Sequence, residues 1–265
     1  HACAFVICRE PTIIYTPVQP AQHNQRGVVT QYPNTGEAGF PIEAIGLLKM
    51  DFLGLKNLTI MRNAVRIIRK VYDAEIDIHT LPLDDKKTYK LLARGDTTGV
   101  FQLESDGMKR YIKELKPDRF EDIMTMVALY RPGPIQNIPA YIARKYGREP
   151  VSYLHPKLEK SIGETFGIPV YQEQVMQACK DLAGFTGGEA DTLRKAMGKK
   201  IASLMARMKD KFVEGCESHS GIDKDLATRI FKQFEDFSAY GFVKAHAGCY
   251  ALIAYQTAYL KAHYQ

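Results

Sequence analysis

Cysteine is scarce in this chain, with five residues among 265. A count that is both low and odd excludes a disulfide-rich scaffold. The cysteines also lack the Cys-x-x-Cys or Cys-x-x-His spacing that is typical of a zinc site. We therefore expect a reducing, cytoplasmic setting and no metal site built on thiolates.

Signals for secretion and for membrane insertion are lacking as well. The first residues, HACAFVIC, have neither the basic n-region nor the long apolar h-region of a signal peptide. The longest apolar stretch, near the C-terminus, is interrupted by His246, Gln256, Lys261 and His263. It predicts a buried core helix rather than a membrane span, so we expect no membrane partner. Because the chain starts at His1 and stops within a helical pattern, we also expect it to be part of a longer protein.

The composition, with 45% apolar and 25% charged residues, is typical of a soluble globular protein and excludes collagen-like and disordered chains. The formal net charge of +6 falls entirely within residues 61–265, because residues 1–60 hold four basic and four acidic residues. Residues 194–211 carry seven basic residues and one acidic residue, Asp210. This segment predicts either a solvated helix face or a phosphate-binding surface.

The pattern of apolar residues predicts an α+β fold. Short strands are predicted at residues 2–8, 27–32 and 46–53, where turn residues separate β-branched or apolar runs. Near Leu55 the spacing becomes helical, and we place the boundary between a small β-containing part and a helical domain there. Helices are predicted at 57–72, 84–94, 120–130, 172–183, 186–198, 201–215, after Asp223, and from about Ala245 onward. Thr186 and Glu189 fit a capping box for one of these helices, and Asp223 can cap another.

The strand predicted at 46–53 carries two charged residues. Lys49 and Asp51 share one face of it, because side chains alternate along a strand. They form either a surface ion pair or a metal-binding carboxylate beside a phosphate-binding ammonium. Two-metal phosphoryl transfer needs several carboxylates, and only Asp51 is evident, so any partner carboxylates are expected outside this chain.

Three other positions each allow two interpretations. The turn Tyr130-Arg-Pro-Gly-Pro134 presents Arg131 rigidly, either to a phosphate or to the last carbonyls of the preceding helix. Tyr171, at the start of a helix, either stacks on a base or packs in the core. Lys244 and His246 lie in a Gly-containing turn, where a helix N-terminus with a hydrogen-bonded histidine is the simpler interpretation.

Six strings run in order across nearly the whole chain: GLLKMDFLGLKNLTI, TTGVFQLESDGMK, LYRPGPIQNIPAYI, GIPVYQEQVMQ, GEADTLRKAMGKK and YGFVKAHAGCYALIAYQTAYLKAHY. Together they closely resemble the bacterial DNA polymerase III alpha subunits, the family C replicative DNA polymerases. The resemblance departs at Val243, where Asn is expected, and at Ala245, where Ser is expected. These two differences leave the contacts around that turn open.

The resemblance implies a palm of the nucleotidyltransferase type, similar to polymerase beta, of which residues 1–55 are the C-terminal part. Residues 56–265 would be the fingers, incomplete at the C-terminus. The family adds dNMP to a primer 3′ end by two-metal phosphoryl transfer, with three palm aspartates holding two Mg²⁺. Asp51 in the KMDFLGL string matches the third aspartate, and Lys49 matches a lysine near the incoming triphosphate. The other two aspartates would lie outside the chain, so we expect the chain alone to be inactive.

In the fingers, the resemblance implies that Arg131 and Tyr171 contact the nucleotide. The residues that it implies as contacts to phosphates of DNA or nucleotide are Arg194, Lys195, Lys199, Lys200 and Lys244. Primer-template DNA and dNTP are the implied ligands, while a sliding clamp and other replicase subunits would bind regions outside the chain. Two alternatives stay open: a non-catalytic nucleic-acid-binding helical module, and an error-prone paralogue of the same polymerase family.

Overall fold

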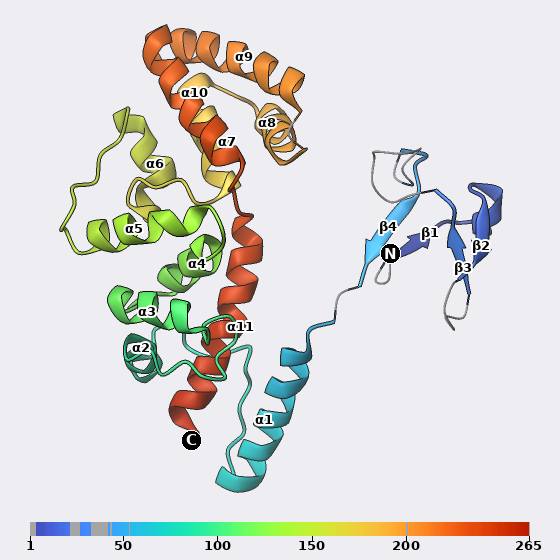
Figure 1. The fold of residues 1–265 in the computed structure, drawn as a ribbon, viewed down its shortest axis with the longest axis vertical. Coiled ribbons are helices and arrows are strands. Elements are labelled where there is room, and N and C mark those ends of the chain that lie inside the picture. The colour runs from blue at the N-terminus through green and yellow to red at the C-terminus, as the bar shows by residue number, and fades with distance from the viewer. Residues whose placement is uncertain are drawn as a thin grey trace. The chain divides into compact units, whose positions relative to one another are not determined.

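The computed structural model describes residues 4–21, 27–32, 42, 44–52, 54–199 and 201–264, with the backbone alone for Lys199. The chain divides into two compact units, His1–Asn63 and Ala64–Gln265. The first contains short strands and the second is helical, so the predicted α+β class is confirmed (Figure 1). The division falls inside helix α1 (Lys56–Tyr72), and the domain boundary near Leu55 stays a prediction.

The described part of the first unit contains two antiparallel strand pairs. Strand β1 (Ala4–Ile7) pairs with β4 (Leu48–Asp51), and β2 (Val18–Pro20) pairs with β3 (Val28–Thr30). The three predicted strands are therefore present, each shorter than its pattern suggested. Strand β2 escaped prediction because it is only three residues long, with Pro17 directly before it and Pro20 as its last residue.

The second unit continues with a series of helices. They are α2 (Lys86–Ala93), α3 (Asp106–Leu115), α4 (Phe120–Leu129), α5 (Ile138–Lys145), α6 (Glu159–Ile162), α7 (Gln172–Ala183), α8 (Gly187–Lys199), α9 (Ala202–Ser220), α10 (Lys224–Ser238) and α11 (Lys244–His263). Of these, α2, α4 and α7 to α11 match predicted ranges, whereas α3, α5 and α6 were not among them. Both predicted caps are present. The Thr186 hydroxyl accepts from the Glu189 amide at 3.3 Å while the Glu189 carboxylate accepts from the Thr186 amide at 2.8 Å. The Asp223 carboxylate accepts from the amide of Leu226 at 2.9 Å.

Helix α11 runs along α4 and α2 (Figure 1). Together with α3 and α5, these helices share one hydrophobic core. In α11, alanines 247, 251, 254 and 258 are buried and let the neighbouring helices approach closely. Two polar side chains of α11 have partners in the loop between α1 and α2: the Tyr255 hydroxyl donates to the Pro82 carbonyl at 2.6 Å, and Gln256 Nε2 donates to the Ile78 carbonyl at 2.8 Å. The prediction of a buried helix holds for this side, whereas Leu252 on the opposite side is exposed. No described helix has both the length and the hydropathy needed to cross a membrane.

The described residues of the second unit form two hydrophobic cores. One is formed by residues of α2 to α5 and α11, and the other by residues of α6 to α10. Two segments that connect them lie side by side around Tyr171 and Phe242, which form a parallel β-bridge. The Gln172 amide donates to the Phe242 carbonyl at 2.8 Å, and the Phe242 amide donates to the Val170 carbonyl at 3.2 Å. Most of the residues predicted to bind phosphate in this unit lie near this junction or on α8.

Candidate functional site

The first predicted site lies on β4. Lys49 and Asp51 do share a face, and the Lys49 ammonium donates to Asp51 Oδ2 at 3.0 Å. The lysine is mostly buried, while more than half of the aspartate side chain is exposed. The carboxylate therefore projects toward solvent with one cation already beside it. This geometry fits both interpretations from the sequence, a surface ion pair and a metal-binding carboxylate beside a phosphate-binding ammonium.

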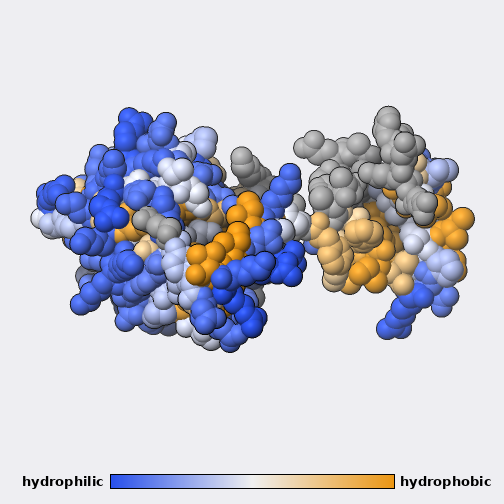
Figure 2. All heavy atoms as spheres, turned by 90° about the horizontal axis from the view of Figure 1, so that it is seen from below, coloured by the Kyte–Doolittle hydropathy of each residue, from blue (hydrophilic) through white to orange (hydrophobic). Residues whose placement is uncertain are grey.

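The opposite face of the β1–β4 pair is hydrophobic and exposed. Phe5 lies across from Met50 and Ile7 lies across from Leu48, and all four side chains are exposed. The Phe52 ring extends this face, with its centroid 5.5 Å from that of Phe5. Figure 2 shows hydrophobic residues gathered on the surface of the strand-containing unit.

The described residues do not assemble a metal site by themselves. Within the described ranges, no group of three or more His, Cys, Asp or Glu side chains is placed to hold a metal ion. Asp51 supplies a single carboxylate, which is too few for a two-metal donor set. A metal at β4 would therefore require carboxylates from beyond this set of residues.

The Arg131 side chain is held by three contacts at the end of α4. Its Nε donates to the Ala128 carbonyl at 2.8 Å, and its Nη2 donates to the Tyr240 carbonyl. The guanidinium also lies over the Phe242 ring, 4.6 Å from the centroid. Burial lowers the pKa of Arg131, which still leaves the group charged at neutral pH. A turn is present at this position and the helix-capping interpretation accounts for the Ala128 contact, while the rigidity of the turn and the nucleotide contact stay predictions.

Gly133 explains how this turn comes so close to the end of α10. Its φ of 99° lies in the left-handed region, and a Cβ there would stand 2.4 Å from Cε1 of Tyr240. Only a glycine lets the backbone pass the Tyr240 ring at this distance. Arg131 and Tyr240 are thereby brought together although 109 positions separate them.

Tyr171 is buried, with 2% of its surface exposed. Its hydroxyl lies 3.4 Å from the Thr125 hydroxyl, and burial raises its pKa well above the ordinary value. The ring packs in the first core with no face open for a base in this conformation. The structure therefore agrees with the packing interpretation, and a role near the nucleotide stays a prediction.

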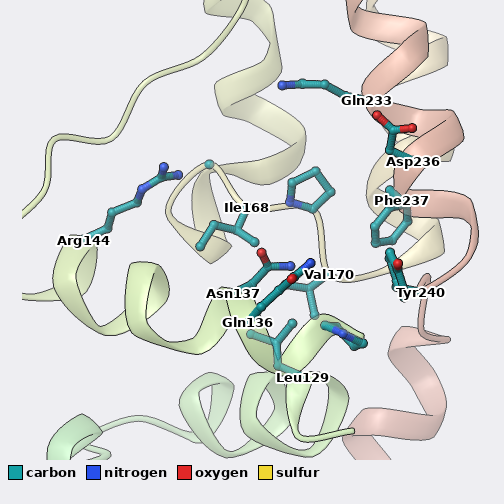
Figure 3. Close-up of a pocket in the computed structure, with 13 residues that line it drawn as sticks. Leu129, Gln136, Asn137, Arg144, Ile168, Val170, Gln233, Asp236, Phe237 and Tyr240 are labelled. Carbon is teal, nitrogen blue, oxygen red and sulfur yellow. The ribbon is translucent and has the colours of Figure 1, made fainter. Parts of the chain in front are cut away.

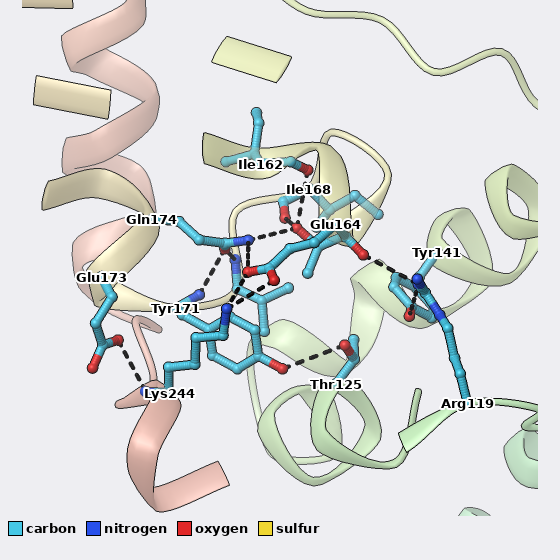
Figure 4. A network of polar contacts seen from close by, with 12 residues as sticks. Arg119, Thr125, Tyr141, Ile162, Glu164, Ile168, Tyr171, Glu173, Gln174 and Lys244 are labelled. Carbon is cyan, nitrogen blue, oxygen red and sulfur yellow. Dashed lines mark hydrogen bonds and ion pairs between the residues drawn. The ribbon is translucent and has the colours of Figure 1, made fainter. Parts of the chain in front are cut away.

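Lys244 is the first residue of α11 and belongs to a polar network that also contains Glu164, Tyr171 and Gln174 (Figure 4). Its ammonium donates to both carboxylate oxygens of Glu164 at 2.8 Å and lies 5.7 Å from the Tyr171 ring centroid. Its backbone amide donates to Glu173 Oε2 at 2.9 Å. His246, in the first turn of the helix, is exposed and contacts the Tyr250 ring, with centroids 4.2 Å apart.

Helix α8 carries the other predicted phosphate contacts. Arg194 and Lys195 both pair with Asp191, at 2.8 and 2.9 Å, and both remain partly exposed. These two cations hold the pKa of Asp191 below its ordinary value. Lys200 lies outside the described residues, and so does the side chain of Lys199.

A cavity of about 330 Å³ lies between the two cores, beside the Arg131 turn (Figure 3). Apolar side chains of Leu129, Ile168, Val170 and Phe237 line it. Polar side chains, including Gln136, Asn137, Gln233 and Asp236, line it as well. The described site residues predicted from the sequence do not belong to its lining, so it carries no part of the predicted chemistry.

The sequence patterns missed Glu164, Glu173 and Gln174. Gln174 could have been found from local spacing, because it lies three positions after Tyr171, the N-cap residue of α7. A Gln side chain at that position commonly accepts from the backbone amide of the N-cap residue. Its Oε1 accepts from the Tyr171 amide at 3.0 Å. The two glutamates had no such signal, because their partner Lys244 is 80 and 71 positions away.

Comparisons with known proteins match the two parts of the chain to two domains of one protein family. Residues 57–220 match the family model described as the bacterial DNA polymerase III alpha subunit finger domain. Residues 1–54 match the bacterial DNA polymerase III alpha NTPase domain. Two similar proteins, each called DNA polymerase III subunit alpha, come from Thermus aquaticus, at 50% identity over 270 residues, and from Aquifex aeolicus, at 49% over 267 residues. All of this chain is covered in both cases, but it spans only 21% and 22% of those proteins.

Proposed function

The chain belongs to the bacterial DNA polymerase III alpha subunit family, and from this premise we propose that it is part of a template-directed DNA polymerase. The reaction joins the primer 3′-oxygen to the α-phosphorus of a dNTP and breaks the bond to the β-phosphate, which releases pyrophosphate. Because the chain spans about a fifth of its relatives, primer-template DNA, dNTP, a sliding clamp and other replicase subunits are proposed as partners of the whole protein.

Asp51 is the proposed catalytic carboxylate. The observation that supports this role best is the placement of Asp51 on β4, with an exposed carboxylate and Lys49 on the same strand face at 3.0 Å. When bound, two Mg²⁺ ions would activate the primer hydroxyl and stabilise the leaving pyrophosphate. Asp51 would hold them together with aspartates from the rest of the protein, and the Lys49 ammonium would bind a triphosphate oxygen.

The helical unit is proposed to bind nucleotide and DNA phosphates. Arg194 and Lys195 remain partly exposed on α8 although they pair with Asp191, and a second anion can bind to their outer side. Arg131 uses Nε and Nη2 for its two carbonyl contacts, and a guanidinium has five N–H donors in all. A chain with one catalytic carboxylate would be inactive by itself, because that carboxylate cannot hold both metal ions.

Primer extension with Mg²⁺ by the full-length protein tests this proposal. We expect Asp51→Asn to abolish extension while a titration with primer-template DNA shows retained binding. Glu10→Gln removes the same charge from an exposed carboxylate of the same unit and is expected to leave extension intact. If Asp51→Asn extended primers at the wild-type rate, the catalytic role of Asp51 would be wrong. A non-catalytic nucleic-acid-binding module would then be the better interpretation.

A further inference from the structure

The Lys244 ammonium is bound by a carboxylate of the protein itself. Both oxygens of Glu164 accept from Nζ at 2.8 Å, and the Tyr171 ring lies beneath the ammonium at 5.7 Å (Figure 4). The two side chains are 40% and 37% exposed, so the pair lies at the surface of the junction between the two cores. A phosphate that approaches this ammonium from solvent meets the Glu164 carboxylate at the same place.

Glu164 is the fixed member of the pair. Its backbone carbonyl accepts from Arg119 Nη2 at 3.1 Å, and its Oε1 accepts from Gln174 Nε2 at 3.3 Å. Gln174 is itself held by the amides of Val170 and Tyr171 at 2.8 and 3.0 Å. The residue is therefore held at its backbone carbonyl by Arg119 and at one carboxylate oxygen by Gln174.

Among the described residues, the hydrogen bond that Lys244 makes outside this pair belongs to its backbone. Its amide donates to Glu173 Oε2, whereas its ammonium is carried by four methylene groups that can rotate. The lysine, rather than the glutamate, can leave the pair when another anion arrives.

We propose that Glu164 competes with nucleic-acid phosphate for the Lys244 ammonium. This inference rests on the proposed phosphate binding by the helical unit, extended to Lys244, which the family resemblance implies as a contact to a phosphate of DNA or nucleotide. On binding, the ammonium exchanges the Glu164 carboxylate for a phosphate oxygen, and the loss of the ion pair reduces the gain from the new contact. The anchored carboxylate also repels the phosphate, so Glu164 limits the affinity for DNA.

A double-mutant cycle in the full-length protein tests the proposal by equilibrium titration with a labelled primer-template at low salt. Glu164→Gln keeps an oxygen that can accept from Gln174 but removes the charge. Because exposed ion pairs contribute little, we expect binding to tighten by about two- to fivefold. Lys244→Ala is expected to weaken binding and to reduce the slope of log K against log salt by about one. In the Lys244→Ala background, Glu164→Gln is expected to have a much smaller effect.

Asp96→Asn is the matched control. Asp96 pairs with Lys261 at the same 2.8 Å distance, so the variant removes one negative charge and releases one lysine elsewhere in the helical unit. A general charge effect would tighten binding equally in Asp96→Asn and in Glu164→Gln, and that result would overturn the proposal.

The remaining outcomes separate the inference from the proposed function. One outcome is that Lys244→Ala weakens DNA binding while Glu164→Gln leaves the affinity unchanged or lowers it. In that case the proposed competition by Glu164 is wrong, and the proposed contact between Lys244 and a phosphate is retained. If Lys244→Ala changes neither affinity nor salt slope, the phosphate contact and the inference both fail, while the Asp51→Asn experiment still decides the polymerase assignment.

Discussion

The buried carboxylate of Asp122 offers the sharpest test of how the helical unit is held together. Asp122 in α4 is fully buried, and its two oxygens accept from Tyr141 Oη at 3.0 Å, Arg119 Nε at 3.2 Å and the Lys145 ammonium. Tyr141 and Lys145 belong to α5, which follows the Arg131 turn. This one carboxylate therefore fastens α5 to α4.

Replacing Asp122 with Ala leaves buried donors without their acceptor. Removing one partner from a buried ion pair costs about 3 to 5 kcal/mol. We expect the lower end, because the Lys145 ammonium keeps its second partner, Asp118, at 2.7 Å. A loss of about 3 kcal/mol raises the population of locally opened α4 and α5 by roughly a hundredfold.

Asp118→Asn is the matched control for Asp122→Ala. It removes a carboxylate from the same ammonium, but the Asp118 side chain is 72% exposed, so the expected cost is about 1 kcal/mol or less. Amide hydrogen exchange of α4 and α5 in the full-length protein measures both effects. Equal losses of protection in the two variants, or a loss below about tenfold for Asp122→Ala, would refute the argument that burial sets the magnitude.

Two further predictions concern the turn and the surface ion pair. Gly133→Ala is expected to cost about 1 to 3 kcal/mol and to expose the amides around Tyr240, because the new Cβ strains the backbone and displaces that ring. Gly147→Ala, which has a positive φ but no neighbour within 4 Å, should cost less, and an equal loss of exchange protection would contradict the steric argument. For pH, the hydrogen bond from Lys145 holds the pKa of Asp118 below its ordinary value, so its stabilising effect is present above about pH 4 and is lost as pH falls through the lowered pKa. The amide exchange protection of α5 should therefore decrease less as the pH falls below about 4 in Asp118→Asn than in wild type. Identical pH dependence in the two proteins would contradict this linkage.

Features that depend on neighbouring positions could be predicted from the sequence. The shared face of Lys49 and Asp51 follows from strand alternation alone, and the ion pair between them confirms it. The caps at Thr186 and Asp223 depend on amides two or three positions away, and both are present. Such contacts are determined by local backbone geometry, which residue type and spacing indicate directly.

Contacts between distant segments could not be predicted in this way. The Arg131 turn shows both cases. The hydrogen bond from Arg131 to the Ala128 carbonyl spans three positions and agrees with one of the two interpretations of the sequence. The bond to the Tyr240 carbonyl spans 109 positions and had no signal. Tyr171 was uncertain for the same reason, since its burial depends on a bridge to Phe242 that the pattern around YQEQ cannot reveal.

The N-terminus of α11 shows how a distant residue can replace a local cap. Val243 occupies the N-cap position and has no side chain that can accept a hydrogen bond, where the resemblance led us to expect Asn. The Glu173 carboxylate, from the first turn of α7, accepts from the Lys244 amide instead. Glu173 thus fixes the backbone of Lys244, while Glu164 binds its ammonium. Since neither contact involves the side chains of residues 243 and 245, the two departures from the family pattern leave the position of Lys244 determined by α7 and by the junction between the cores.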